Sequence, residues 1–394
     1  MTGSVRAKIE QHGDELRAEG AKGEKLGRLT DRTVEILREA DAMRMFQPKE
    51  YGGLEVRPRE FAETVMSLAA LDPSAGWVLG VVGVHPWQLA YNDPRVREEV
   101  WGEDSSLWMA SPYMPGGLLV PNGDGTYTFN GRWQFSSGTD HCRWAFLGAM
   151  LADETGAMVQ PPQMVHVIIP RGDYEIIDDT WDVVGLRGTG SKDLVVKDAI
   201  VPDYRTMTWE DVESGDGQRR SGRTETLYAL PWSAMFPLGI TAATIGAAEG
   251  LLYHARQYQA ERINAQGTAI KDDPYTLYQF GEHAADIRAA RLELLANADA
   301  FWERAEAGEF PDFAARAEGR ATQVRSAWRA VRAANEIYAR CGGNALRMDK
   351  PLQRYWRDMQ AGLHHAIHSP NTVFHAAALS ALGPDPQGPL RAMI

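Results

Sequence analysis

CGGNALRMDKPLQRYWRD, residues 341–358 of the 394 in this chain, separates two helical patterns near the C-terminus. Its glycine pair favours a turn, and Pro351 favours the first position of a new helix. On both sides of this stretch, apolar residues recur at three- and four-residue steps, as in an amphipathic helix. The segments with this spacing are 235–262, 274–307, 311–341 and 351–382. Such lengths, joined by short connections, predict an up-and-down four-helix bundle.

The N-terminal part of the chain has helical spacing as well. Thr30 is the expected N-cap of one helix, because its hydroxyl can accept a hydrogen bond from a free amide of the first turn. Pro58 can open the next helix at its first position. The very apolar stretch 75–91, AGWVLGVVGVHPWQLAY, predicts a buried helix that Pro86 kinks or ends.

Between residues 105 and 203 the apolar period changes to two. The runs TYTFNGRWQF, RWAFLGAML, QMVHVIIP and KDLVVKDAIVP predict strands of an antiparallel β-domain, since no helical pattern alternates with them. The polar stretch 210–223 predicts an exposed loop or linker. The expected fold class is therefore α+β with several domains. These are a helical domain at 1–104, a β-domain at 105–228 and a helical bundle at 229–394.

Charge and composition exclude several classes of function. The chain has 41 Lys and Arg against 53 Asp and Glu, a net charge of −12, and lacks the basic surface that nucleic-acid binding needs. The longest nearly apolar stretch, 75–84, is too short to cross a bilayer, which takes ~20 residues. The start has no apolar signal-peptide core, and two distant cysteines predict reduced thiols. We therefore expect a cytoplasmic protein that binds neither nucleic acid nor membrane.

Three passages together resemble the acyl-CoA dehydrogenase fold over essentially the whole chain. NGRWQFSSG, residues 130–138, is similar to the flavin-contacting strand and turn of that family. GLRGTGSKDLVVKDAIVP, residues 185–202, is similar to its middle-domain exit strand, and residues 341–358 are similar to its C-terminal signature. The resemblance implies an N-terminal helical domain, a central β-domain and a C-terminal four-helix bundle.

Within that fold, the chain most resembles the oxygenase components of flavin-dependent phenol hydroxylases, especially those that hydroxylate the phenolic ring of secosteroids. The stretches SAGWV, GVHPW, EVWGED, WQFSSGTDH and QRYWRD carry this resemblance. It implies reduced FMN (or FADH2) and O2, a flavin hydroperoxide, and a phenol that becomes a catechol. It also implies a separate NAD(P)H-dependent flavin reductase and a homotetramer. The family pattern has an acidic residue where this chain has Ser369, so the identity of the phenol stays open.

The resemblance also implies which residues contact the flavin. Ser136 and Ser137 lie in a tight turn, which serine favours for local reasons alone, whereas the family match makes their hydroxyls donors to the flavin ring. Arg262 matches the family's phosphate-contacting arginine, although an arginine is usually just a solvated surface residue. The full implied set is Trp77, Ser111, Pro112, Tyr113, Phe135, Ser136, Ser137, Arg262, Gly343, Asn344, His365 and Ala366.

Histidine is the natural base for phenol activation, because its unperturbed pKa of ~6.5 lies near neutrality. The family match selects His365 as this base and Ser137 as the second catalytic residue. His85 and Trp87, in GVHPW, are the expected substrate contacts, and His85 is the second candidate base.

Other interpretations of the same sequence remain open. An acyl-CoA dehydrogenase would need a carboxylate base, yet no Asp or Glu occurs in residues 359–384, where many members of that family carry it. A non-catalytic assembly protein on the same scaffold is the third interpretation. No metal site is expected: His364 and His368 lie four residues apart, but two imidazoles without a carboxylate rarely bind a metal.

Overall fold

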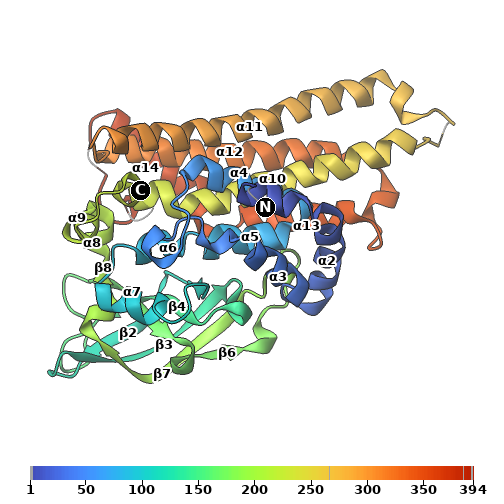
Figure 1. Ribbon diagram of the computed structural model, residues 1–394. Helices are drawn as coiled ribbons and strands as arrows, with labels where there is room; N and C mark the ends of the chain where they lie inside the picture. Colours follow the sequence, from blue (N-terminus) through green and yellow to red (C-terminus); the bar gives the residue numbers. More distant parts are fainter. Residues whose placement is uncertain (1–2, 266, 385, 392–393) are drawn as a thin grey trace.

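The computed structural model describes residues 3–265, 267–384, 386–391 and 394. The long C-terminal helices lie side by side, the N-terminal helices pack beneath them, and the β-sheet lies on the far side of the N-terminal helices (Figure 1). The bundle is formed by α10 (Trp232–Glu261), α11 (Pro274–Glu306), α12 (Phe313–Ala339) and α13 (Pro351–Leu363). The predicted order of helices, then a β-domain, then a helical bundle is confirmed.

The fourth predicted helix of the bundle is interrupted. After α13 comes a short 3-10 turn (Ala366–His368), and α14 (Pro370–Ala381) completes the segment. Pro370 begins α14, because a proline fits the first position of a helix, where its missing amide hydrogen has no partner to lose. His364 and His365 therefore lie in the break and do not occupy successive positions of one helix.

Seven helices precede the sheet within the described residues: α1 (Val5–Glu10), α2 (Gly13–Leu26), α3 (Asp31–Glu39), α4 (Pro58–Leu71), α5 (Pro73–Val82), α6 (His85–Leu89) and α7 (Pro94–Trp101). As predicted, Thr30 caps α3, accepting from the Thr33 amide at 3.2 Å, and Pro58 begins α4. The apolar segment 75–91 forms two helices instead of one: α5 ends at Val82, before Pro86, and α6 follows. Pro86 lies in the first turn of α6, where a backbone amide has no intrahelical partner to lose.

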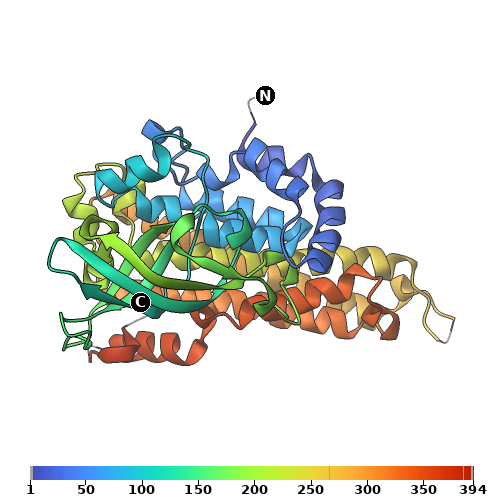
Figure 2. The same cartoon turned by 90° about the horizontal axis from the view of Figure 1, so that it is seen from below.

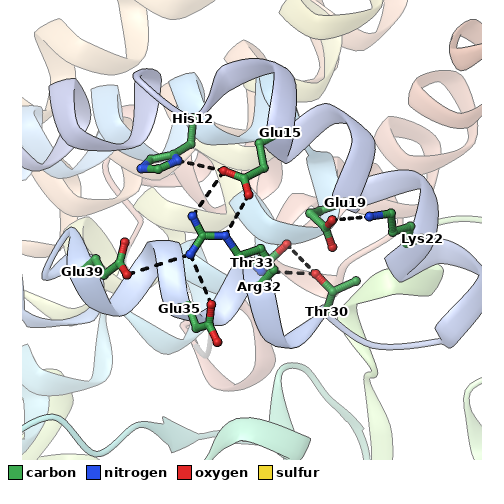
Figure 3. A network of polar contacts seen from close by, with 9 residues as sticks. All are labelled: His12, Glu15, Glu19, Lys22, Thr30, Arg32, Thr33, Glu35 and Glu39. Carbon is green, nitrogen blue, oxygen red and sulfur yellow. Dashed lines mark hydrogen bonds and ion pairs between the residues drawn. The ribbon is translucent and has the colours of Figure 1, made fainter.

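A charged network joins α2 to α3 on the protein surface (Figure 3). Arg32 on α3 donates to both carboxylate oxygens of Glu15 on α2, at 2.8 Å and 3.3 Å. Its Nη1 also lies 3.2 Å from Glu35 and 3.9 Å from Glu39. Hydrogen bonding to Arg32 lowers the pKa of Glu15 to about 2. Exposed ion pairs stabilise a protein only weakly, so this network adds little to the stability of the fold.

The central sheet contains β1 (Met109–Ala110), β2 (Pro115–Pro121), β3 (Thr126–Ser136), β4 (Trp144–Leu151), β5 (Met164–Pro170), β6 (Glu175–Ile177), β7 (Lys192–Pro202) and β8 (Thr206–Thr208). Their order is β6-β7-β3-β2-β4-β5-β8, with β1 beside β4. Most pairs are antiparallel, as expected, but β4 runs parallel to β1 and β2, so the sheet is mixed. The reason is the connection: β3 occupies one edge of β2, so the chain crosses to the other edge before β4 begins.

The prediction of an exposed loop at 210–223 is wrong, because most of this stretch is helical. α8 (Trp209–Ser214) and α9 (Asp216–Arg220) occupy this stretch. Thr208 caps α8 by accepting from the Asp211 amide, and two acidic residues in the first turn favour the helix through its dipole. Gly215, with φ +77°, separates the two helices.

The N-terminal helices reach the bundle through a close crossing of α5 and α10. A Cβ at Gly80 would lie 2.5 Å from the Gly239 carbonyl oxygen, and a Cβ at Gly239 would lie 2.2 Å from that of Gly80. Only glycine at both positions allows this approach, and α5 is buried along its whole length. Within the described residues, α10 alone is long and apolar enough to pass for a membrane span, but 89% of its most apolar window is buried inside the protein. That burial is typical of a core helix.

Candidate active site

Three predicted residues from distant parts of the chain meet beyond the end of β3; we refer to Trp77, Ser137 and His365 as the Ser137 cluster. Trp77 Nε1, on α5, donates to Ser137 Oγ at 3.1 Å. The ring centroids of Trp77 and His365 lie 5.7 Å apart. Trp77 and Ser137 are buried, and His365 is half-buried. The fold thus brings both predicted catalytic residues to the same tryptophan.

Ser137 begins a chain of hydroxyls that ends on a backbone carbonyl. Its Oγ lies 2.7 Å from Ser191 Oγ, which lies 2.7 Å from Thr189 Oγ1. Thr189 donates its one hydroxyl hydrogen to Leu186 O at 2.7 Å, so it accepts from Ser191, and Ser191 accepts from Ser137. The hydroxyl hydrogen of Ser137 therefore points to Ser191, while its oxygen receives the Trp77 N–H.

A β-bulge turns Phe135 away from the core. The register of β3 against β7 shifts between Trp133 and Ser136, and Phe135 takes a φ of +64°. A bulge of this kind re-aims a side chain, and 64% of Phe135 is exposed. The neighbouring Ser136 is fully buried, and its Oγ has no hydrogen-bond partner among the described residues. An exposed ring beside an unpaired hydroxyl suits contact with a planar ligand that has polar edges.

His365 is a hydrogen-bond donor in this geometry. Its Nδ1 accepts the amide hydrogen of Ile367 at 3.2 Å. Burial lowers the pKa of His365 to about 4, and the charge of Arg320 acts in the same direction. The imidazole is therefore neutral at pH 7 and carries one hydrogen, which must lie on Nε2 because Nδ1 accepts.

Buried polar groups hold the break that carries His365. Arg320 donates through Nη2 to Ile367 O at 2.6 Å. His368 is fully buried, and its Nδ1 donates to Gly362 O at 3.0 Å. Burial lowers the pKa of His368 to about 3, so this histidine is neutral and structural. Hydrogen bonds to Gly362, before His365, and to Ile367, after it, thus hold the backbone that carries His365.

His85 lies in a second aromatic cluster. It is fully buried, and its Nδ1 lies 3.0 Å from Tyr113 Oη, which joins a predicted substrate residue to a predicted flavin residue. The Tyr113 ring packs 4.7 Å from Phe236 and 5.9 Å from Phe146. Burial lowers the pKa of His85 to about 3, so the ring is neutral. Its Nε2 has no hydrogen-bond partner in the described part of the chain.

The remaining predicted residues near these clusters differ in their contacts. Trp87 is 1% exposed, donates to Leu227 O at 3.0 Å and meets Tyr91 edge-on at 5.3 Å. These are the contacts of a packing residue, and its contact with substrate stays a prediction. Ser111 is buried, with no partner for its Oγ within the described ranges. Pro112 O accepts a backbone amide of β4 at 3.1 Å.

The predicted phosphate-contacting residues lie at one end of the bundle. Arg262 follows α10, and its Nη1 donates to Arg340 O at 2.8 Å. Gly342 has φ +72°, and a Cβ there would lie 2.4 Å from Arg262 Nη2, so only glycine lets the guanidinium rest against this turn. Gly343 and Asn344 begin the turn that follows. This end of the bundle extends past the sheet in both views (Figures 1 and 2). No hydrogen bond or ring contact between described residues joins it to the Ser137 cluster.

Sequence patterns missed several polar residues of these clusters. Thr189 and Ser191 come from GLRGTGS, the start of the passage similar to the family's middle-domain exit strand, and the signal for them is its hydroxyl content. Gln88 accepts a hydrogen bond from Tyr113 and contacts His166. Gln88 and His166 both lie in apolar runs of the sequence, which do not predict a polar cluster. Ala366, an expected flavin contact, is exposed beside His365. Among the described residues, no group of three or more His, Cys, Asp or Glu is placed to hold a metal.

Comparisons with known proteins agree with this architecture. Residues 238–370 match the family described as acyl-CoA dehydrogenase, C-terminal domain. The chain is 66% identical over 394 residues to a pigment production hydroxylase of Rhodococcus erythropolis, with 100% of both chains covered. It is 38% identical over 373 residues to HsaA, a flavin-dependent monooxygenase oxygenase subunit of Mycobacterium tuberculosis, covering 94% of this chain and 93% of HsaA. The crystal structure of M. tuberculosis HsaA superposes with a TM-score of 0.91 at 36% identity, covering 99% of both chains.

Fold, site and relatives together define a flavin-dependent aromatic monooxygenase built on the acyl-CoA dehydrogenase fold. The chain belongs to the oxygenase components of two-component enzymes of this class, the family that includes HsaA. A further solved relative, XiaF from Streptomyces sp. in complex with FADH2 and glycerol, superposes with a TM-score of 0.92 at 25% identity, covering 98% of this chain and 96% of XiaF.

The residues of this chain fit a flavin. Two buried hydroxyls, on Ser111 and Ser136, lack partners within the described residues and can bond to ring heteroatoms. Phe135, the residue before Ser136, is exposed, and Trp77 donates to Ser137 in the Ser137 cluster. Arg262 rests on the turn at Gly342, which brings a cation next to the backbone, the combination that phosphate sites use.

Proposed function

We propose that this chain hydroxylates a phenol to a catechol with reduced flavin and O2. The observation that carries this proposal is the bare Nε2 of His85. Tyr113 donates its hydroxyl hydrogen to Gln88 Oε1 at 2.7 Å, so Nδ1 of His85 must donate to Tyr113, and Nε2 is left as an acceptor. A phenol has a pKa of ~10 and is neutral near pH 7, so a buried acceptor at its hydroxyl makes the ring more nucleophilic.

The two histidines then have different tasks. His85 accepts a hydrogen bond from the phenol hydroxyl at Nε2 and takes its proton as oxygen transfer makes that hydroxyl acidic. His365 donates a hydrogen bond through its own Nε2. This division departs from the expectation that His365 is the base, and it keeps His365 in the site. The support is the tautomer of each ring, because only a nitrogen without a hydrogen can take a proton.

A bound reduced flavin would supply the electrons that activate O2, and O2 supplies the oxygen atom that is transferred. Trp77, Phe135 and His365 would contact its ring, and the hydroxyls of Ser111 and Ser136 would bond to its polar edges. Arg262 and the turn at residues 343–344 would hold its phosphate. FMN is the form we favour, although FADH2 is bound in the solved relative XiaF.

We place the substrate among phenols of steroid origin. Among the relatives are a FADH(2)-dependent resorcinol hydroxylase at 29% identity and a p-hydroxyphenylacetate 3-hydroxylase at 26% identity. The substrate in each of these names is a phenol. A crystal structure described as 3-HSA hydroxylase from Rhodococcus superposes with a TM-score of 0.92 at 34% identity, covering 99% of both chains. The rings of Phe146 and Phe236 pack against His85, and aromatic rings of this kind favour contact with a flat, apolar substrate.

The enzyme works as a homotetramer supplied by a separate NAD(P)H-dependent flavin reductase. Large apolar side chains gather around the Arg262 end of the bundle, an arrangement typical of an interface. They are Ile263 (64% exposed), Tyr275 (84%), Tyr278 (66%), Leu346 (65%) and Met348 (73%). A neighbouring copy would bring its Arg262 end to the Ser137 cluster and complete the flavin site. Cys142 and Cys341 are buried free thiols, as a cytoplasmic protein would have.

The test is direct oxidation of a panel of phenols. The purified chain is mixed with reduced FMN or reduced FAD in aerated buffer, and the catechol and hydrogen peroxide formed are measured by chromatography. We expect catechol from at least one multi-ring phenol, a higher yield with FMN, and only hydrogen peroxide without a phenol. Tightly held FAD that an acyl-CoA reduces, with no catechol from any phenol, would replace this proposal by a dehydrogenase.

A further inference from the structure

Four side chains form one buried hydrogen-bond chain, which we call the His85 chain: His85, Tyr113, Gln88 and His166. His85 Nδ1 lies 3.0 Å from Tyr113 Oη, and Tyr113 Oη lies 2.7 Å from Gln88 Oε1. Gln88 Nε2 lies 2.9 Å from His166 Nδ1. His85, Gln88 and His166 are at most 1% exposed. The chain joins α6 to β5, two elements that are far apart in the sequence.

The orientation of the Gln88 amide sets the direction of every hydrogen in the His85 chain. An amide nitrogen can only donate, so Gln88 donates to His166 Nδ1 and its oxygen is left to accept. Tyr113 gives its hydrogen to that oxygen, and His85 therefore donates to Tyr113. His85 and His166 are both neutral, because burial lowers the pKa of each to about 3. Each ring then carries one hydrogen, on Nδ1 in His85 and on Nε2 in His166.

We propose that Gln88 and His166 are positioning residues that keep Nε2 of His85 free of hydrogen, so that it accepts the phenol proton. Their effect passes through Tyr113, and neither residue touches the substrate. This inference rests on the proposed function, in which His85 is the proton acceptor. It adds two residues to the site that no sequence motif marks.

Ring packing holds the middle of the chain in place. Tyr113 stacks on His166 with centroids 4.4 Å apart and an interplanar angle of 12°. Phe236 packs on Tyr113 at 4.7 Å, and Trp209 packs on His166 at 5.5 Å. A stacked tyrosine keeps its hydroxyl between His85 and Gln88, so the direction of the chain depends on the Gln88 amide. His166 holds that amide in place, because its Nδ1 lies 2.9 Å from the Gln88 NH2 group.

The first test reads the tautomer directly. ¹⁵N-histidine-labelled full-length protein is studied by long-range ¹H–¹⁵N correlation NMR, with His85→Gln used to assign the His85 signal. We expect His85 of the wild-type protein to be protonated on Nδ1 and Gln88→Leu to move the hydrogen to Nε2, because Tyr113 then donates to His85. Nε2 protonation in the wild-type protein, or an unchanged tautomer in Gln88→Leu, would overturn the inference whether or not any phenol is turned over.

The second test follows catalysis. Gln88→Leu should lower the catechol formed per reduced FMN by about 10–100-fold, the range that a lost buried hydrogen bond of ~1–3 kcal/mol predicts. The KM for the phenol should change much less than kcat. Gln88→Glu should restore most of the yield, since a protonated carboxyl accepts from Tyr113 and donates to His166 as the amide does. A Gln88→Glu yield no higher than that of Gln88→Leu would contradict the inference.

A matched control separates positioning from packing. Gln218 is also buried and donates to a single carbonyl, Leu230 O at 2.6 Å, outside the His85 chain. Gln218→Leu loses a buried amide of the same kind and should leave both the His85 tautomer and the catechol yield unchanged. His166→Phe keeps the stacking on Tyr113 but removes the acceptor, so its yield should fall with that of Gln88→Leu. Equal losses in Gln218→Leu and Gln88→Leu would reduce the effect to stability alone.

Discussion

Trp77 Nε1 donates to Ser137 Oγ at 3.1 Å, which ties a fully buried helix to the turn that follows β3. This bond occupies the oxygen of Ser137, while the Ser137 hydrogen points to Ser191. With its one hydrogen on Ser191, Ser137 can bond to a flavin only as an acceptor, through the remaining lone pair of its oxygen, and not as the donor that the family resemblance implies. The properties of the Ser137 cluster thus depend on residues that never touch the ligand.

Ser137→Ala should release hydrogen peroxide faster in the absence of a phenol. Losing one hydrogen bond to a buried partner costs ~1–3 kcal/mol, or about one to two decades in rate. Peroxide formation is followed by a coupled assay after mixing with reduced FMN and O2. Ser191→Ala keeps the Ser137 hydroxyl but removes the acceptor that orients it, so its rate should fall between those of the wild-type protein and Ser137→Ala. Identical rates in all three proteins would remove Ser137 from the flavin site.

His85 and His365 should respond differently to replacement by glutamine. His85→Gln loses the proton acceptor, and general-base help typically contributes ~10²–10⁴-fold, so catechol formation should slow by that order. His365→Gln keeps a donor N–H and should retain more activity than His365→Ala. Rapid-mixing product analysis measures both, with the exposed His364→Ala as control. Coupled hydroxylation by His85→Gln, with loss in both His365 variants, would return the base to His365.

Arg262→Ala should weaken the binding of reduced FMN by about 10–100-fold, the usual cost of a lost charge-assisted hydrogen bond of ~1.5–3 kcal/mol. Equilibrium dialysis under anaerobic conditions measures the affinity. Arg256→Ala removes an exposed arginine of α10, the helix that ends just before Arg262, and should bind normally. Riboflavin, which has no phosphate, should bind the wild-type protein and Arg262→Ala equally well. Weaker binding of riboflavin by Arg262→Ala than by the wild-type protein would mean that Arg262 contacts a part of the flavin other than its phosphate.

Light scattering should show a tetramer for the wild-type protein. Met348→Glu puts a charge on an apolar side chain that is 73% exposed in the single chain, and should shift the protein toward smaller species. Flavin binding should weaken with it, because the proposed site needs a neighbouring copy. Lys350→Glu, a charge change on the same turn, is the control for net charge. A wild-type monomer that binds FMN fully would exclude the shared site.

Acid should destabilise the protein through its buried histidines. Burial lowers the pKa of His85, His166 and His368 from 6.5 to about 3. Between these values the unfolded chain binds protons that the folded chain does not, so this stability is present above pH 6.5 and is lost as pH falls toward 3. Each group contributes about 1.4 kcal/mol per pH unit to the slope.

Asp358 has the opposite sign in the same window. Burial raises its pKa to about 7, so its contribution to stability falls as pH rises from 3.8 to 7. Asp358→Asn, which can still accept the Leu186 amide, should therefore steepen the loss of stability in acid. Urea unfolding at pH 7 and pH 5 measures both slopes. A free energy of unfolding that does not change between pH 7 and pH 5 in either protein would mean that these histidines are not buried neutral.

Local sequence was sufficient for most of the architecture. The three- and four-residue apolar steps located the long helices, and the caps at Thr30 and Pro58 needed only neighbouring residues. Period-two runs located the main strands. What local patterns missed depends on connections: the parallel pairing of β2 with β4 follows from which edge of β2 is free. The helices at 210–223 were masked by a polar composition that also suits loops.

The family resemblance was enough to name Trp77, Ser137 and His365 as residues of one site. It could not show which atom of each side chain carries a hydrogen. Whether an imidazole nitrogen donates or accepts depends on its partner, and Tyr113 and Ile367 reach their histidines only in the folded chain. The pKa of His85 likewise depends on burial, which a sequence does not display. Residue types and periodicity thus determine the fold and the family, because both rest on local patterns of apolar and polar residues. Proton positions are decided by tertiary structure, because a hydrogen bond needs two groups within about 3 Å of each other.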